Sequence, residues 1–97
     1  MKYETYINRN TGIMYKRISK NEAKKLFIAG HKLIIAPVNA NLHCTFQTWA
    51  YIQHNDIDGY EAAADFDRVV NSFIYYNCNN EMGLYLKYFA PADVAKW

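Results

Sequence analysis

The first third of the chain alternates apolar and polar residues with the period of a half-buried β-strand. This alternation runs through Tyr3–Asn8 and returns in Ile13–Ile18, with the turn residues Asn10-Thr11-Gly12 between the two segments. Gly12 can adopt the positive φ that a tight hairpin requires. The return strand turns its odd-numbered residues to one face and its even-numbered residues to the other. The pattern therefore predicts a β-hairpin.

A helix is predicted after the hairpin, because Ser19 and Glu22 have the spacing of a capping box. The residues that follow form one apolar stripe, made of Ala23, Leu26 and Phe27. Gly30 stands where a glycine in the left-handed conformation would end the helix. The helix therefore covers the interval between Ser19 and Gly30.

Two further strands are predicted before the second helix. His31–Val38 is short, apolar and rich in β-branched residues, which favours a buried strand that stops at Pro37. In Phe46–Gln53, two different sets of side chains alternate along the chain, which predicts a strand with two different faces. One face would carry Phe46, Thr48, Ala50 and Ile52, and the opposite face Trp49 and Tyr51.

The second predicted helix spans Tyr60–Tyr76. Its apolar stripe has helical spacing and consists of Phe66, Val69, Val70, Phe73 and either Tyr76 or Asn77. Acidic residues in its first two turns suit the positive end of the helix dipole, so Asp65 and Asp67 are not interpreted as a catalytic pair. A last strand is predicted at Leu84–Phe89, with Pro91 breaking it.

These elements predict one α+β domain over residues 1–97, with two helices packed on a mainly antiparallel sheet and a short tail at 90–97. A hydrophobic content of 52% with 16% aromatic residues excludes intrinsic disorder. The longest apolar run is too short for a membrane-spanning helix. The first residues have no apolar signal segment, so we expect a protein of the cytoplasm.

Charge is distributed unevenly along the chain. Residues 1–32 hold eight basic and two acidic residues, a net charge of +6, whereas residues 33–97 have a net charge of −4. A basic face of this kind predicts contact with an acidic protein surface or a nucleic acid, and the alternative is simple solvation of two surfaces. The candidate partner-binding residues are Lys16, Arg17, Lys20, Lys24 and Lys25.

Nine tyrosines in 97 residues are an unusually large number. Tyrosine has an apolar ring and a polar tip, which suits interfaces and ligand pockets as well as the core of a small domain. We therefore expect the tyrosines to divide between core and contact surface. The candidate ligand or interface residues are Tyr75, Tyr76, Asn79, Asn80, Trp49 and Tyr51.

The sequence contains no motif with established catalytic chemistry. Its four glycines all fall at predicted element ends, which leaves no phosphate-binding loop. His43, Cys44 and Cys78 could assemble a zinc site in three dimensions, although burial as small apolar residues is the expected role of the cysteines. The segment Asp56-Ile57-Asp58-Gly59 resembles only a fragment of a calcium loop. We therefore expect neither a cofactor, nor a metal, nor an enzymatic activity.

Two segments carry a resemblance to known sequences. They are TGIMYKRISK at residues 11–20 and YYNCNNEMGLY at residues 75–85. With them, the chain resembles small open reading frames of phages, prophages and mobile elements of Gram-positive bacteria. The resemblance implies an accessory protein in the cytoplasm of a bacterial host, of the kind that binds and inhibits a host or antiviral-defence protein. It implies no residue roles.

The leading interpretation is therefore a non-enzymatic binding module with a protein partner. A nucleic-acid-binding protein that uses its basic N-terminal third is an alternative, and it predicts a steep loss of affinity with salt. A sponge or sensor for a nucleotide-like ligand is another. A virion component and a homodimer through the Trp49 and Tyr51 face also stay open.

Overall fold

The computed structural model describes residues 4–38, 42, 49–54, 59–77 and 86–95. The elements, in chain order, are β1 (Thr5–Ile7), β2 (Met14–Ile18), α1 (Lys20–Ile28), β3 (Leu33–Pro37), β4 (Ala50–Ile52), α2 (Gly59–Asn77) and β5 (Leu86–Pro91). The strands form one sheet in the order β1-β2-β5-β3-β4, and every neighbouring pair is antiparallel. The predicted α+β class, with two helices on an antiparallel sheet, is confirmed.

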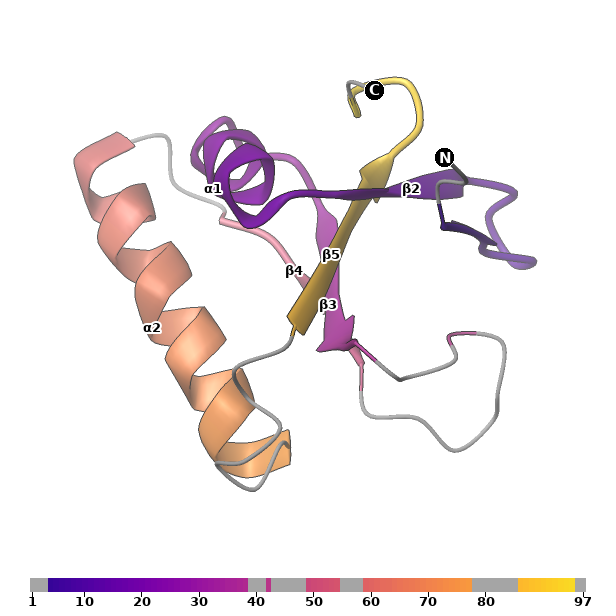
Figure 1. Ribbon diagram of the computed structural model, residues 1–97. Helices are drawn as coiled ribbons and strands as arrows, with labels where there is room; N and C mark the ends of the chain where they lie inside the picture. Colours follow the sequence, from indigo (N-terminus) through magenta and orange to yellow (C-terminus); the bar gives the residue numbers. More distant parts are fainter. Residues whose placement is uncertain (1–3, 39–41, 43–48, 55–58, 78–85, 96–97) are drawn as a thin grey trace.

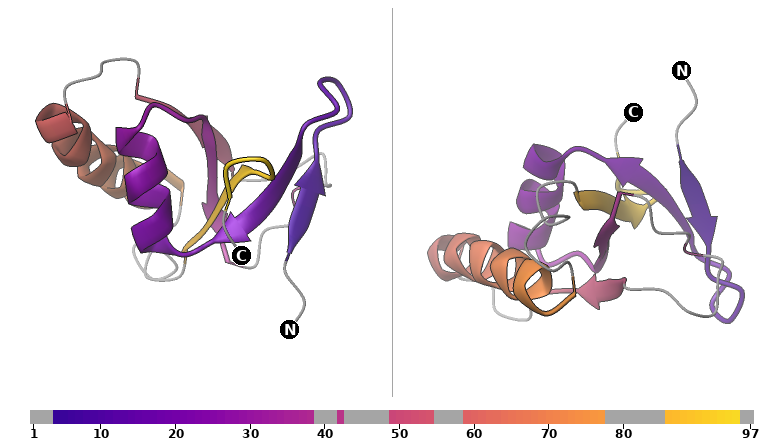
Figure 2. Two further views of the ribbon diagram at one scale, coloured as in Figure 1. Left: turned by 90° about the horizontal axis from the view of Figure 1, so that it is seen from above. Right: turned by 60° about the horizontal axis from the view of Figure 1, so that its bottom comes forward.

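Both helices lie on the same side of the sheet, and the β1–β2 hairpin extends from the opposite end of the molecule (Figures 1 and 2). The C-terminal strand β5 lies in the middle of the sheet between β2 and β3, so the two ends of the chain meet in one layer. No helix in the described ranges is long and apolar enough to cross a membrane.

The hairpin turn depends on Asn8. Its Oδ1 accepts the backbone N–H of Asn10 at 2.9 Å and of Thr11 at 3.3 Å, and its carbonyl oxygen accepts the N–H of Gly12 at 2.7 Å. Gly12 has a φ of 74°, which confirms the conformation that the turn was predicted to need. The hairpin is therefore held by one side chain and one glycine.

Helix α1 begins and ends as predicted. Ser19 is the N-cap, and its hydroxyl accepts the N–H of Glu22 at 3.2 Å. At the other end Gly30 has a φ of 93° and donates its N–H to Phe27 O at 3.0 Å. His31 donates to Leu26 O at the same distance, which completes a Schellman motif.

The prediction that Pro91 breaks the last strand is wrong, because β5 runs from Leu86 through Pro91. Ala92 donates its N–H to Met14 O at 2.8 Å. In an antiparallel ladder successive residues point their N–H groups to opposite sides, so the nitrogen of Pro91 faces away from β2. On that side the pairing of β5 with β3 already ends at Phe89, so no ladder hydrogen bond is lost.

The short tail is also different from the prediction. The chain turns after β5, where Val94 and Ala95 donate their N–H groups to Pro91 O at 3.0 and 2.9 Å. Both side chains pack against the buried core on the helix side of the sheet. This turn is therefore part of the packed domain and not a free end.

One face of the sheet forms the core beneath the helices, here called the helix-side core. The apolar stripe predicted for α2 lies in it, with Phe66, Val70 and Phe73 buried and Val69 partly buried. Its buried members are Ala23, Phe27, Leu33, Ile35, Ile52, Phe66, Val70, Phe73, Tyr88 and Ala90. The contacts of Phe66 with the rings of Phe27 (5.3 Å) and Tyr88 (6.1 Å) join the two helices and β5.

The opposite face carries a second cluster, here called the aromatic core. It contains Tyr15, Ile34, Ala36, Leu42 and Phe89, with Tyr6, Trp49 and Tyr51 packed against them. The predicted alternation in the fourth strand is confirmed, because Ala50 and Ile52 contact the helix-side core whereas Trp49 and Tyr51 contact the aromatic core. Phe46 and Thr48 lie outside the described residues.

The sheet curls so far around the aromatic core that side chains from its two edge strands meet. The rings of Tyr6 on β1 and Trp49 beside β4 are 5.7 Å apart in an edge-to-face arrangement. The amide Nδ2 of Asn8 donates to the Tyr51 hydroxyl at 2.5 Å. These contacts connect strands that are separated by three others in the order of the sheet.

Candidate binding surface

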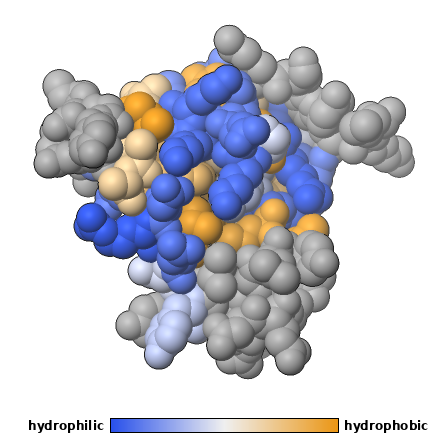
Figure 3. All heavy atoms as spheres, turned by 60° about the vertical axis from the view of Figure 1, so that its left-hand side comes forward, coloured by the Kyte–Doolittle hydropathy of each residue, from blue (hydrophilic) through white to orange (hydrophobic). Residues whose placement is uncertain are grey.

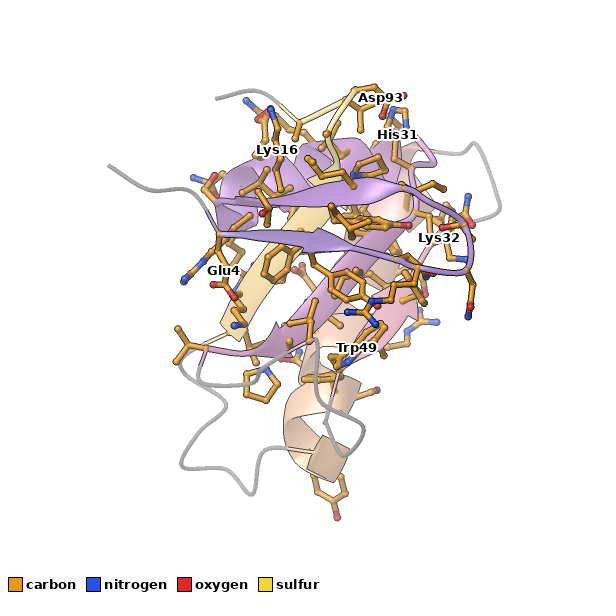
Figure 4. All side chains as sticks on the ribbon, turned by 90° about the vertical axis from the view of Figure 1, so that its right-hand side faces the viewer. Glu4, Lys16, His31, Lys32, Trp49 and Asp93 are labelled. Atoms are coloured by element: carbon orange, nitrogen blue, oxygen red, sulfur yellow. The ribbon has the colours of Figure 1, made fainter. Side chains whose placement is uncertain are left out.

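The predicted basic face is divided between two sides of the sheet. Lys16 belongs to the even-numbered set of β2, together with Ile18, which packs on the helix-side core. Arg17 belongs to the other set and forms an ion pair with Glu4 at 3.4 Å. Figure 4 shows Lys16 and Glu4 on opposite long sides of the hairpin. The structure therefore separates Arg17 from the remaining candidate lysines.

The three candidate residues on α1 are on the same side of the sheet as Lys16. Lys20 and Lys25 are exposed, and Lys24 is half-buried. Lys24 Nζ lies 3.4 Å from Asp67 Oδ2 on α2. This ion pair between the two helices is exposed and therefore contributes little to stability. Lys20 and Lys25 are thus the members of the predicted set best placed for an external contact.

Sequence reasoning missed the ionic group around Glu4. Lys87 is almost completely buried on β5, and its Nζ lies 2.6 Å from Glu4 Oε2. Glu4 Oε1 faces Arg17, so one carboxylate bridges β5, β2 and the start of β1. Lys87 Nζ also lies 5.7 Å from the ring centroid of Phe89. Because every contact is internal, this group serves the fold, and no spacing in the sequence indicated it.

Trp49 and Tyr51 also serve the interior. The two rings are 5.2 Å apart, and the Tyr51 ring lies 6.0 Å from that of Tyr15. Burial, and to a smaller extent the Tyr51 hydroxyl nearby, raises the pKa of Tyr15 above its usual value. Lys32 Nζ stands 4.5 Å from the Tyr51 ring centroid and covers its outer side. The two residues of the predicted contact face therefore pack against the aromatic core.

Tyr75 is the one candidate of the α2 exit whose side chain the structure describes. It is 71% exposed, on the solvent side of the helix. The side chain of Tyr76, together with Asn79 and Asn80, lies outside the described residues. The pocket for a nucleotide-like ligand predicted there stays a prediction.

A buried histidine is the closest approach to a chemical site. His54 Nδ1 lies 3.0 Å from Asp65 Oδ2, and Arg68 Nη1 lies 3.6 Å from the other carboxylate oxygen. The His54 side chain is 10% exposed, its ring lies 5.7 Å from that of Phe27, and its Nε2 has no hydrogen-bond partner. Asp65 thus links α2 to the end of β4. Asp65 and Asp67, predicted to serve the helix dipole, also pair with side chains.

Among the described residues, no three histidine, cysteine, aspartate or glutamate side chains form a group that could hold a metal ion. His43, Cys44 and Cys78 lie outside those residues, as do Asp56, Ile57 and Asp58. The zinc site and the calcium loop therefore stay alternatives at the level of the sequence.

Exposed apolar side chains gather on the hairpin. Ile7, Ile13 and Met14 are each between 40 and 46% exposed, and they are here called the hairpin surface. Ile7 and Met14 are directly opposite each other across β1 and β2. A shallow hollow lined by Ile13, Met14, Ala92 and Asp93 continues this surface onto the end of β5. The helices do not reach this part of the sheet (Figure 2).

The face of the molecule on the α2 side has a different character. Its described atoms are mainly hydrophilic, with hydrophobic atoms in smaller patches between them (Figure 3). The exposed positions of α2 include Asp67, Arg68, Asn71 and Ser72. On the hairpin, by contrast, the exposed side chains of Ile7 and Met14 are direct neighbours. Adjacent exposed apolar residues of this kind often mark an interaction site.

Comparison with known proteins does not identify the chain: no family model matches it, and neither a curated protein nor a solved structure shows significant similarity. The resemblance to phage and mobile-element reading frames therefore stays a prediction.

Proposed function

We propose that the chain is a small non-enzymatic binding module that takes a protein partner on the hairpin surface. The observation that supports this most directly is the exposure of Ile7, Ile13 and Met14 together on one hairpin, whereas the other exposed large apolar residues of the described chain, Val38 and Tyr75, lie outside it. Burial of such side chains by a partner would be favourable by about 25 cal/mol per Å² of apolar area.

Charge supports an acidic partner. Arg9 lies in the hairpin turn and is exposed, and Lys20 and Lys25 are exposed on the same side of the sheet as Met14. Exposed basic side chains on the same side of a domain steer an acidic surface toward it during association and leave the apolar contact to hold it. The setting suggested by the sequence resemblance is a phage or mobile-element accessory protein that inhibits a host or antiviral-defence protein.

Affinity capture from a bacterial host lysate tests the proposal, with three variants compared to the wild type. Ile13→Ser/Met14→Ser removes the apolar centre, and we expect it to reduce capture of the partner at least about tenfold. Lys20→Glu/Lys25→Glu should reduce capture less, mainly through the association rate. Asn71→Ser/Ser72→Asn on α2 is the matched control and should capture as the wild type does.

A salt series on the captured complex distinguishes a protein partner from the main alternative, which is a nucleic acid. A protein held by apolar contact should stay bound between about 50 and 200 mM salt, whereas binding to phosphates falls steeply over this range. If nuclease treatment released the bound material, and if Ile13→Ser/Met14→Ser captured as much of it as the wild type, nucleic-acid binding would replace the proposal. Equal capture of a protein partner by the wild type and by Ile13→Ser/Met14→Ser would show that the hairpin surface does not bind it.

A further inference from the structure

The outer edge of β1 carries backbone groups that have no hydrogen-bond partner among the described residues. Asn8 donates its N–H to Ile13 O at 3.0 Å, which shows that the even-numbered residues of β1 point their backbone groups toward β2. Thr5 and Ile7 therefore point their N–H and C=O groups to the outside. Within the part of the chain that the structure describes, these four groups make no hydrogen bond, and both residues are exposed.

The two edge strands of the sheet differ in the exposure of their residues. On β4 the residues Ala50 and Tyr51 are half-buried, and the Tyr51 side chain is fixed within the aromatic core. On β1 neither a proline nor a charged residue stands at the outward-facing positions. The short length of β1, three residues, limits the strength of such pairing, but an edge without proline or charge can still pair with another strand.

The outward groups of β1 are complementary to themselves. When two copies of β1 run antiparallel with Tyr6 opposite Tyr6, Thr5 of each copy faces Ile7 of the other. Such a pair exchanges both backbone hydrogen bonds, so the two equivalent pairs use all of the outward N–H groups. The side chains of Thr5 and Ile7 also share one face, where two β-branched residues form a favourable cross-strand pair.

We infer that a second copy of this chain binds along β1 and joins the two five-stranded sheets into one continuous antiparallel sheet across a two-fold axis at Tyr6. In this arrangement Ile7 of each copy lies between its own Met14 and the partner's Thr5. The two hairpin surfaces become neighbours on one side of the joined sheet. The inference depends on the edge of β1 and not on the protein partner proposed above.

Sedimentation velocity from about 10 μM to about 1 mM measures the association directly. We expect the wild type to change from monomer to dimer over this range. Ile7→Pro removes an N–H that the fold itself does not use, and it should weaken the dimer about tenfold or more. Ile7→Val keeps the N–H and the β-branched side chain, and should dimerise as the wild type does. A wild type that stays monomeric up to about 1 mM overturns the inference.

Hydrogen exchange covers the case in which Ile7→Pro does not fold. In the wild type the amides of Thr5 and Ile7 should be unprotected at the low concentration and become protected at the high one, while that of Tyr6 is protected throughout. A dimer that forms without protection of Thr5 and Ile7 uses another surface and also overturns the inference. Because these measurements use the purified chain alone, their failure leaves the capture experiment on the hairpin surface unaffected.

Discussion

The helix-side core and the aromatic core lie on opposite faces of one sheet, yet they are closed in different ways. Helices α1 and α2 cover the first, and their apolar stripes exclude water from Phe66 and its neighbours. The second is closed by the curl of the sheet, which brings Tyr6 against Trp49. A cluster at the rim of a curled sheet remains near water, so its side chains need polar tips as well as apolar bodies.

This difference explains where the polar groups are. The aromatic core includes the hydrogen bond between Asn8 and Tyr51 and lies beside the ion pair between Lys87 and Glu4. The helix-side core contains one tyrosine among apolar residues, Tyr88, which is 4% exposed. Its burial raises its pKa to about 12. The helix-side core is therefore stabilised mainly by apolar burial, with the His54–Asp65 pair at its margin beside Phe27, whereas the aromatic core includes paired polar groups.

The largest expected effect is on the helix side. Phe66→Ala removes a fully buried ring between Phe27 and Tyr88 and should lower the free energy of unfolding by about 3–5 kcal/mol. Urea denaturation measures the change, and Phe66→Leu, which keeps most of the volume, should cost clearly less. A loss below about 1 kcal/mol for the alanine variant would mean that α2 does not seal this face.

Alkaline pH should act on the same core through Tyr88. The folded state holds its phenol neutral up to about pH 12, whereas the unfolded chain ionises it near the usual value of 10.0. Stability from this group is therefore complete below pH 10.0 and falls as the pH rises toward about 12, by about 2–3 kcal/mol in total.

Urea denaturation between pH 9 and 12 measures this slope, and Tyr88→Phe provides the control. The phenylalanine variant should keep its stability at neutral pH and lose part of the alkaline slope. The remainder is expected from the aromatic core, where burial also raises the pKa of Tyr6 and Tyr15. An alkaline slope identical in the two proteins would show that water reaches the Tyr88 hydroxyl.

The smallest of these effects is expected from the ion pair on the other face. Glu4→Gln removes the carboxylate charge that lies 2.6 Å from the buried Lys87 ammonium, and we expect a loss of about 1–2 kcal/mol, moderated because Glu4 is 39% exposed. Lys87→Met in the same background should restore most of that loss, since a buried apolar residue needs no counter-charge. If the double variant is as unstable as the single one, Glu4 stabilises the protein through Arg17 instead.

Local patterns predicted most of the elements. The Ser19 cap, the positive φ of Gly12 and Gly30, and the stripe of α2 follow from interactions within a few residues, and each is confirmed. The error at Pro91 has a tertiary cause. Whether a proline interrupts a strand depends on which neighbour its nitrogen faces, and that is decided by the order of strands in the sheet.

The candidate site was less predictable for the same reason. Arg17, Trp49 and Tyr51 were expected at a surface, but the curl of the sheet directs them to partners distant in the sequence. Lys87 and Glu4 are separated by 83 positions, so no spacing rule could join them. Ile7 and Met14 are exposed because the helices on their side of the sheet do not reach the hairpin, whereas Ile13 lies at the end of the hairpin turn.

The sequence by itself thus determined the helices, the hairpin and the two faces of β2 and β4, because periodicity, caps and turns are properties of neighbouring residues. Only the tertiary structure decided the strand order, the curl that makes a second core, and the choice between buried and exposed for each aromatic and charged residue. Those outcomes depend on contacts between distant segments, whose energies no local pattern contains.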